Sequence, residues 1–368
     1  MCLTLVTGVG AARAQDVPPA GQPVAAPPPA PVVLFGATLE GYFAHNANRP
    51  DSLVNTFRAY DSRTDSFALQ QAAIVIDAPP SVTDGRRYGL RLDLQFGQAV
   101  GALQGNPANE PHPDLYRNVW QAYGTYVFPV GRGLTLDFGK FASPLGVETN
   151  YAKDDDHFTR ALLFDFLPFY HMGARVSVPV SDRLTASYMI TNGAQQTEDF
   201  NSLQAHHGMV IVKLPQHLHV TASVYRSHEP SGIVNILDAQ AAWTPVGPIS
   251  AGLDLARTGS RAPEADHVRT LTGVGTYVRA AHGPWAAAVR YEWLDDAGGL
   301  FAGLAQTLQE ITATGEWRGA DGFLTRIELR RDFSDRQVFS ARGATTSAAQ
   351  TTITAGLVWW IGTKKGGW

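Results

Sequence analysis

The sequence predicts an all-β fold: a transmembrane, antiparallel, up-and-down β-barrel of about 16 strands. Three observations support this prediction. Apolar and polar residues alternate in short segments, long and short connections alternate between those segments, and tryptophans lie near the predicted strand ends. Alternation with a period of two gives a strand one apolar and one polar face, as expected for a strand between lipid and a water-filled lumen.

The alternation is clearest in residues 88–96, 218–224 and 285–293. In the first of these, leucines and terminal aromatic residues occupy one face, while Arg91 and Asp93 occupy the other. The predicted strands are 32–45, 67–78, 88–98, 116–128, 134–141, 170–179, 184–191, 206–214, 218–228, 236–244, 249–257, 268–280, 285–294, 308–317, 323–333 and 350–361. Their number is even, as in single-chain bacterial barrels, and large enough to leave an aqueous lumen.

The connections and the tryptophans fit the same architecture. Short turns rich in Pro, Gly and Asp alternate with longer polar loops, which is typical of periplasmic turns facing extracellular loops. Amphipathic indole rings prefer the two membrane interfaces. The predicted aromatic girdle comprises Trp120, Trp243, Trp285, Trp293, Trp317 and Trp359.

The N-terminal region predicts export. Residues 1–14 are expected to be a signal peptide, because an apolar stretch precedes a small-x-small cleavage pattern. The basic start of such a signal is missing, so either the natural start lies upstream or the signal is atypical. Residues 15–31 are rich in proline and predict an extended periplasmic tether, with a docking motif for a partner as the alternative. The barrel is expected over residues 32–362, followed by a C-terminal tail at 363–368.

Composition excludes several classes of protein. The formal net charge of −4 leaves no basic footprint for nucleic acid. The single cysteine, Cys2, lies in the predicted signal peptide, so the mature chain is expected to contain no disulfide. No uninterrupted apolar stretch beyond the N-terminus is long enough for a membrane-spanning helix.

Several segments resemble the OmpL-like β-barrel porins. They are Gly139–Phe141 with Ser143–Glu148, Thr159–Phe164 continuing to Pro168–Gly173, Thr191–Gly193, Arg290–Trp293 and Arg326–Asp332. The resemblance covers most of the chain after the tether and implies an outer-membrane barrel that passes small solutes. Two positions depart from it. Ala194 stands where an aromatic residue is expected, and the residues before Trp368 interrupt the alternation that leads to a terminal aromatic residue.

The longest connection, residues 142–169, is the predicted third extracellular loop. Its second half is too apolar to remain in water, so we expect it to fold into the lumen and narrow the pore. The alternative is an ordinary solvated loop. Three consecutive aspartates lack the spacing of a calcium-binding loop, so no metal site is predicted. The candidate constriction residues are Asp154, Asp155, Asp156 and Arg160.

The parity of each strand predicts which charged side chains line the lumen. The candidate wall residues are Arg91, Asp93, Arg175, Arg290, Glu292, Arg326, Glu328, Arg330 and Asp332, with Asp238, Asp254, Glu310 and Glu316 as further inward carboxylates. Rings of charge set ion preference in pores, and the mixture of signs predicts weak selectivity that leans toward cations. The alternative is that these residues pair with one another and only keep the wall polar.

Together these features predict a porin in a bacterial outer membrane: a water-filled channel for passive diffusion of ions and small hydrophilic solutes. No motif for a hydrolase, a zinc protease or a phosphate-binding loop is present, and no enzymatic activity or cofactor is expected. The alternative is a barrel with lipid or peptide hydrolase activity, or with a ligand-binding or adhesion role. The expected partners are outer-membrane lipid, diffusing solutes and the barrel-assembly machinery, and a homotrimer is open by analogy with other porins.

Overall fold

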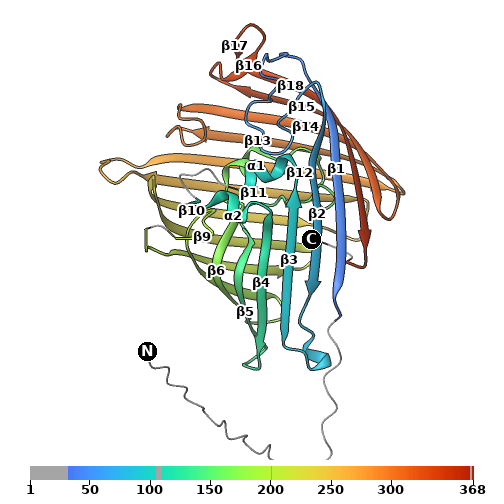
Figure 1. Ribbon diagram of the computed structural model, residues 1–368, viewed down its shortest axis with the longest axis vertical. Helices are drawn as coiled ribbons and strands as arrows, with labels where there is room; N and C mark the ends of the chain where they lie inside the picture. The colour runs from blue at the N-terminus through green and yellow to red at the C-terminus, as the bar shows by residue number, and fades with distance from the viewer. Residues whose placement is uncertain (1–31, 105–109, 200, 365–366) are drawn as a thin grey trace, which may run out of the picture.

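The computed structural model describes residues 32–104, 110–199, 201–364 and 367–368, and the predicted signal peptide and tether lie outside this part of the chain. Sixteen antiparallel strands form one closed barrel, which confirms the predicted fold class (Figure 1). The barrel strands are β1 (Leu34–Asn46), β2 (Phe67–Ala78), β3 (Tyr88–Phe96), β4 (Val119–Phe128), β5 (Leu134–Ala142), β6 (Tyr170–Pro179), β7 (Leu184–Thr191), β8 (Ala205–Leu214), β9 (Leu218–Glu229), β10 (Gly232–Trp243), β11 (Ile249–Arg261), β12 (Arg269–His282), β13 (Trp285–Asp296), β14 (Gln306–Ala320), β15 (Phe323–Ser334) and β18 (Ala349–Gly362). Two further strands, β16 (Phe339–Ala341) and β17 (Thr345–Ser347), form a small hairpin in the last connection.

Each strand pairs with its neighbours in sequence, and β1 pairs with β18 to close the barrel. The two faces of a strand differ as the alternation predicts. On β15, Arg326 and Glu328 are buried on the inner face, whereas Ile327 and Leu329 are 59% and 51% exposed on the outer face. Closure leaves no free strand edge in the bilayer, and an apolar outer face suits contact with lipid.

One predicted loop is absent. The prediction starts the tenth strand at residue 236, but β10 begins at Gly232, and only Pro230 and Ser231 connect it to β9. Gly232 has a φ of +120°, and a Cβ at this position would lie 2.0 Å from the carbonyl oxygen of Arg261. Only glycine allows this close approach, so the hairpin continues to a tight turn. The regular alternation of long and short connections is therefore wrong at this turn.

The connections contain a few short helices. They are η1 (Val82–Asp84), α1 (Gln98–Leu103), α2 (Pro113–Tyr116) and α3 (Leu162–Phe166). Within the described residues, none of the helices is long and apolar enough to cross a membrane.

Apolar packing inside the barrel joins the long connection between β5 and β6 to the wall. Leu162, Leu163 and Leu167 of this connection are buried in one cluster with inward residues of β8–β14. Glycines on the wall make room for them. A Cβ on Gly273 would lie 2.4 Å from Leu163, and one on Gly356 would lie 2.3 Å from the Phe158 ring. Side chains of the loop thus fill the space beside these wall glycines, where any larger wall residue would collide with them.

A row of aromatic rings crosses the outer face near the short turns. The ring centroids of Trp285 and Trp317 lie 6.4 Å apart, and Phe323 lies 5.2 Å from Trp359. Trp285 and Trp359 are 62% and 41% exposed, and Trp243 is 39% exposed. Amphipathic rings at this level suit a membrane interface.

At the other end of the strands, Trp293 has the outward parity of its neighbour Tyr291, which is 39% exposed. The assignment of Trp120 to the girdle is wrong, because Trp120 is only 2% exposed and packs against Tyr170 in an internal cluster. The cause is a β-bulge. The partner of Asp93 is Gln121, but the partner of the next residue on β3 is Val119, so Trp120 is the extra residue and leaves the alternation.

Candidate functional site

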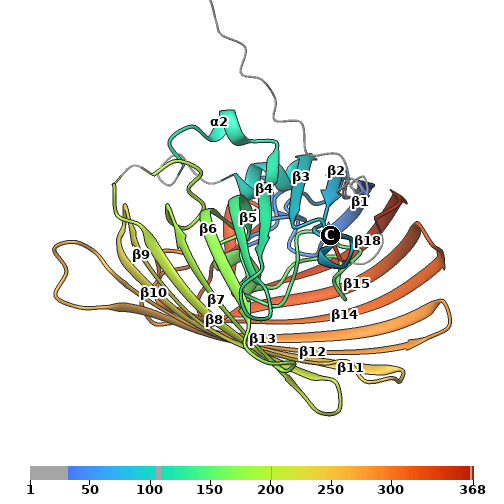
Figure 2. The same cartoon turned by 90° about the horizontal axis from the view of Figure 1, so that it is seen from below.

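Residues 143–169, between β5 and β6, lie inside the barrel and bridge strands on different sides of it (Figure 2). The carbonyl oxygen of Pro144 accepts a hydrogen bond from Gln240 on β10 at 3.0 Å. The backbone N–H of Ala152 donates to Glu40 on β1, also at 3.0 Å. Because β10 and β1 lie far apart around the barrel, this loop spans the lumen.

Arginines of β13 and β15 bind backbone carbonyl groups of the loop. Arg326 donates to the carbonyl oxygens of Ala152 and His157 at 2.6 and 2.8 Å. Arg290 donates to the carbonyl oxygen of Thr159 at 2.9 Å. Both guanidinium groups are buried, and several N–H groups of each donate hydrogen bonds to protein oxygen atoms.

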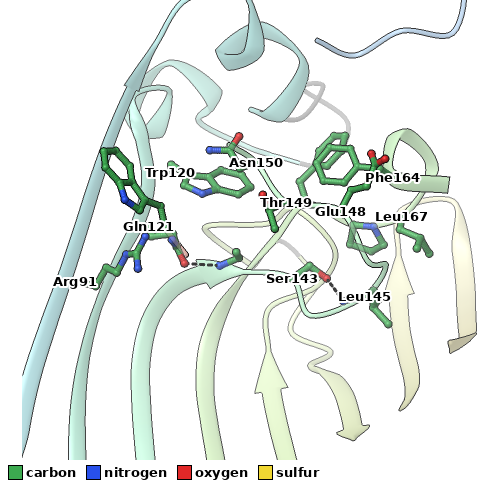
Figure 3. Close-up of a pocket in the computed structure, with 14 residues that line it drawn as sticks. Arg91, Trp120, Gln121, Ser143, Leu145, Glu148, Thr149, Asn150, Phe164 and Leu167 are labelled. Atoms are coloured by element: carbon green, nitrogen blue, oxygen red, sulfur yellow. Dashed lines mark hydrogen bonds between the residues drawn. The ribbon is translucent and has the colours of Figure 1, made fainter. Parts of the chain in front are cut away.

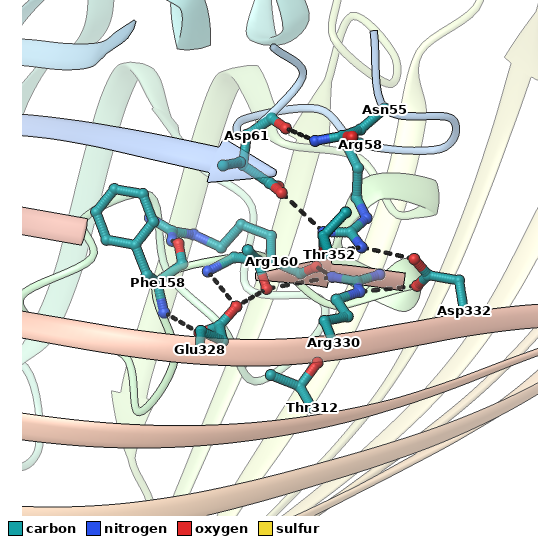
Figure 4. Close-up of polar contacts among 12 residues, drawn as sticks. Asn55, Arg58, Asp61, Phe158, Arg160, Thr312, Glu328, Arg330, Asp332 and Thr352 are labelled. Carbon is teal, nitrogen blue, oxygen red and sulfur yellow. Dashed lines mark hydrogen bonds and ion pairs between the residues drawn. The ribbon is translucent and has the colours of Figure 1, made fainter. Parts of the chain in front are cut away.

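Carboxylates of the same wall bind backbone N–H groups of the loop. Glu328 accepts hydrogen bonds from Phe158 at 2.8 Å and Thr159 at 3.2 Å (Figure 4). Glu292 accepts one from Leu163 at 3.0 Å. We call the inner faces of β13, β14 and β15 the docking wall, since their alternating charges match the carbonyl and N–H groups of the loop backbone.

The first long connection, residues 47–66, joins the same network. Arg58 lies 2.7 Å from Asp61 and 2.5 Å from Asp332, and Arg330 lies 2.7 Å from Asp332 (Figure 4). All four side chains are buried. Removal of one partner from such a buried network is costly, because it leaves an uncompensated charge inside the protein.

Two of the predicted constriction residues hold the loop together. Asp155 and Arg160 pair at 3.2 Å and are 8% and 1% exposed. Arg160 also donates to the carbonyl oxygens of Thr149 and Asn150, at 2.9 and 2.8 Å. Burial raises the pKa of Asp155 to about 8, against the opposing effect of Arg160.

The other two predicted constriction residues lie nearer the edge of the loop. Asp154 pairs with Lys153 at 2.7 Å, and Asp156 lies 3.4 Å from Arg279 of β12. The side chain of Asp156 is 37% exposed, so it is the most accessible of the four. Of the three consecutive aspartates, Asp155 is therefore buried inside the loop, whereas Asp154 and Asp156 lie nearer its surface.

A histidine lies among the arginines of the docking wall. The Nδ1 atom of His157 is 2.7 Å from the hydroxyl of Thr314. Burial and the nearby Arg290, Arg326 and Arg330 lower the pKa of His157 well below its ordinary value. The imidazole is therefore neutral at physiological pH and adds no charge to the cluster.

All of the predicted wall residues lie on the inner face or contact it. Away from the docking wall, Arg91 pairs with Asp93 at 2.8 Å, and Arg175 pairs with Asp137 at 2.8 Å. Arg175 is the more accessible arginine, with a side chain that is 22% exposed. These charges compensate one another in pairs.

The inner faces of β6, β7, β8 and β9 form what we call the far wall. Most of its inward side chains are uncharged, among them Ser187, Met189, His207 and Ser223, and Arg175 of β6 is an exception. Neither ring nitrogen of His207 nor the hydroxyl of Ser223 has a hydrogen-bond partner among the described residues. In the same described set, no hydrogen bond joins residues 144–168 to the far wall.

Two carboxylates lie between the docking wall and the far wall. Asp238 on β10 accepts a hydrogen bond from Gln240 at 2.8 Å, and Asp254 on β11 accepts one from the N–H of Val147 at 3.3 Å. Both are at most 3% exposed. Within the described ranges, neither forms a salt bridge, so neither carboxyl has a cationic partner.

Comparison with known proteins identifies the family. The family model described as "Putative beta-barrel porin-2, OmpL-like" matches residues 33–359. The chain belongs to the OmpL-like β-barrel porins. A search of curated proteins found no match.

Solved porins share the fold of this porin at low sequence identity. The anion-selective porin from Comamonas acidovorans has a TM-score of 0.59 at 11% identity, over 89% of this chain and 99% of that one. The outer membrane channel DcaP of Acinetobacter baumannii gives 0.59 at 10%, over 89% and 97%. OmpF of Salmonella typhi, in complex with daunomycin, gives 0.58 at 10%, over 89% and 97%. Family and fold together establish an outer-membrane porin channel.

The porin's C-terminal tail turns into the lumen. Lys364 pairs with Asp77 at 2.8 Å, and the Trp368 ring lies 5.6 Å from that of Tyr151 in the loop. A Cβ on Gly36 would lie 2.6 Å from the Trp368 ring, so the absence of a side chain there makes room for it. Trp368 thereby lines a cavity of about 170 Å³ between the loop and strands β3–β5 (Figure 3).

Sequence reasoning identified the inner face but missed how it is used. The docking of the loop depends on contacts between residues about 170 positions apart, for which no local pattern exists. Residues 363–368 were expected to be a tail that follows the barrel, and the contacts of Lys364 and Trp368 inside the lumen have no sequence signature. The neutral side chains of the far wall were visible as the inward parity of β7 and β9.

Proposed function

We propose that ions and small hydrophilic solutes cross the membrane between the loop at residues 143–169 and the far wall. The observation that supports this path is the one-sided attachment of the loop. From residue 144 to residue 168 its hydrogen bonds run to β1–β3, β10, β11 and the docking wall. On the far wall, His171 lies 3.1 Å from the Ser143 hydroxyl at the start of the loop, and most other inward side chains are uncharged. A loop fixed along one side narrows the lumen without closing it.

We further propose a preference for cations along this path. The inner-wall arginines Arg91, Arg175, Arg290, Arg326 and Arg330 all lie in salt bridges. Asp238 and Asp254 have no salt bridge among the described residues. Unpaired negative charge at a narrow, poorly screened position attracts cations and repels anions.

Planar bilayers containing the purified porin test both proposals. Stepwise ohmic conductance is expected, and the reversal potential across a KCl gradient should have the sign of a cation preference. The double variant Asp238→Asn and Asp254→Asn should reduce that potential toward zero, because the amides keep the hydrogen-bond acceptors but lose the charge. Asp266→Asn, in an exposed loop, serves as the matched control and should leave the potential unchanged.

Two results would contradict these proposals. A silent bilayer, together with hydrolysis of lipid or peptide, would favour a barrel enzyme over a channel. An anion preference, or an unchanged reversal potential in the double variant, would refute the proposed cation selectivity.

We also propose a homotrimer, supported by the trimer form of OmpT from Vibrio cholerae, which has a TM-score of 0.57 at 11% identity over 90% of this chain and 100% of that one. Outer-membrane lipid and the barrel-assembly machinery are the other proposed partners.

A further inference from the structure

A cavity of about 260 Å³ lies at the long-loop end of β9–β11. Its inner side is formed by Tyr225 and Ile236 of the barrel wall, and its outer side by Phe166 and Leu300 of two long connections. Four different segments thus contribute one surface. The cavity borders the far wall at the end of the barrel where solutes would enter the proposed path.

Apolar side chains form about half of the cavity lining and lie together on one part of it. Phe166 provides an aromatic ring, which also packs 5.9 Å from the ring of Phe301. Ile236 is only 3% exposed, and Val234 and Leu300 pack against the same hydrophobic cluster. Such a surface favours a solute with an apolar or aromatic body.

One carboxylate gives the cavity its charge. Glu229 lies at the end of β9 and accepts hydrogen bonds from the N–H of Ala194 at 2.9 Å, from Gln196 at 2.7 Å and from Ser227 at 2.5 Å. Three donors fix its position. Glu229 forms no salt bridge in the described part of the chain, and no lysine or arginine lines the cavity.

A second polar group is available to a ligand. Thr258 lines the cavity from β11 and is 3% exposed, and its hydroxyl has no hydrogen-bond partner among the described residues. A buried hydroxyl without a partner is costly unless water or a ligand satisfies it. The hydroxyl of Tyr225, which also lines the cavity, has no partner among the described residues either, so the barrel wall offers a ligand two hydroxyl groups.

We infer that this cavity binds an amphipathic organic cation, with its apolar body against Phe166 and Ile236 and its charged group toward Glu229. An inorganic cation would gain nothing from the apolar walls, and an organic anion would be repelled by Glu229. Aromatic faces also attract quaternary ammonium groups. The inference rests on the proposed transport path, because it names the class of solute that would bind at the entrance of that path.

Isothermal titration calorimetry of the purified full chain in detergent tests the inference. The probes are benzyltrimethylammonium, benzenesulfonate and benzyl alcohol, which share a ring and differ in charge. Benzyltrimethylammonium is expected to bind about tenfold more tightly than the other two, a difference of about 1.4 kcal/mol. Equal affinities for the three probes would overturn the inference.

Two variants locate the site. Phe166→Ala and Glu229→Gln should each weaken binding of benzyltrimethylammonium by about tenfold. Glu264→Gln, in the exposed loop between β11 and β12, is the matched control and should bind as the wild type does. Because Glu229 also fixes loop backbone, Phe166→Ala keeps the test valid if Glu229→Gln disturbs the fold. Unchanged binding in Phe166→Ala would overturn the inference.

Bilayer recordings on the same preparation separate the two proposals. Ohmic conductance without binding of benzyltrimethylammonium would refute the cavity as a cation site and leave the channel standing. Binding without conductance would refute the channel and leave the site standing.

Discussion

The docking wall and the far wall are built from the same alternation of outward apolar and inward polar residues, yet they differ in what their inner side chains contact. On the docking wall, Arg326 and Glu328 bind the backbone of a loop that lies inside the barrel. On the far wall, His207 and Ser223 have no hydrogen-bond partner among the described residues. The docking wall holds the loop by charged hydrogen bonds, whereas the far wall contributes apolar residues such as Tyr225 to the cluster that buries Leu162.

This difference separates two uses of charge in one lumen. Charges that alternate along β15 resemble a selectivity ladder, but Arg326, Glu328 and Arg330 bind carbonyl and N–H groups of the loop. Asp332 binds Arg58 of the first long connection. Groups that are already bonded to protein have less capacity left for a passing ion. Ion selectivity is therefore expected to depend on Asp238 and Asp254, between the two walls. The stability of the folded protein is expected to depend on the docking wall.

The largest effect is expected from removing a single docking arginine. Arg326→Ala would leave three carbonyl groups of the loop without their donor. It would also remove the buried partner that lies 2.6 Å from Glu316, which keeps Arg279 at 2.8 Å. Loss of one partner of a buried ion pair typically costs about 3–5 kcal/mol. The free energy of unfolding in urea should fall by this order, and single-channel conductance should rise as the loop leaves the lumen.

Arg331→Ala provides the control on the same strand. Arg331 is exposed on the outer face, where its closest described hydrogen bond is 3.5 Å long. Its removal should change neither stability nor conductance by a comparable amount. Equal effects from the two variants would show that the docking wall does not hold the loop.

A smaller effect is expected on the far wall, and it has the opposite sign. Ser223 points inward on β9, and Ala222 beside it points outward. Ser223→Trp should lower single-channel conductance, because the indole would enter the proposed path. Ala222→Trp places the same ring on the lipid face and should leave conductance unchanged.

A conductance that is insensitive to Ser223→Trp would place the path elsewhere. The cavity between the loop and β3–β5, which Trp368 lines, would then be the next candidate. Conductance measured on both tryptophan variants in the same bilayer distinguishes these outcomes.

Much of this comparison could be predicted from the sequence. Parity alone placed Arg326 and Glu328 on the inner face, because a strand has only two faces and lipid requires one of them to be apolar. The strand count followed from the same pattern. What parity cannot give is the partner of an inward side chain, since that depends on the path of a loop more than a hundred residues away.

Local irregularities account for the other errors. Trp120 seemed to belong to an interfacial girdle, but a bulge opposite Asp93 turns it inward. Gly232 seemed to lie in a long loop, but it allows the backbone to approach Arg261 and extends β10. Both errors come from an irregular backbone conformation at a single residue, which an alternation counted over a whole strand does not reveal.

The last prediction concerns whether water reaches the interface between the loop and the docking wall. Asp165 in α3 is buried, accepts one hydrogen bond from the N–H of Ala59 at 3.2 Å, and has a pKa that burial raises to about 8. In the unfolded chain this carboxyl titrates near 4. Between these two values the folded protein holds a proton that the unfolded chain has released, so stability should decrease as pH rises from about 4 to about 8 and then level off.

Asp165→Asn removes this dependence, because the amide cannot ionise. The free energy of unfolding in urea, measured at several pH values from 5 to 9, should fall more steeply in the wild type than in Asp165→Asn. Asp114→Asn, at a side chain that is 94% exposed, should follow the wild-type profile. Parallel profiles for the wild type and Asp165→Asn would mean that water reaches Asp165, and that the loop is held by charged hydrogen bonds in a wet interface and not by a dry one.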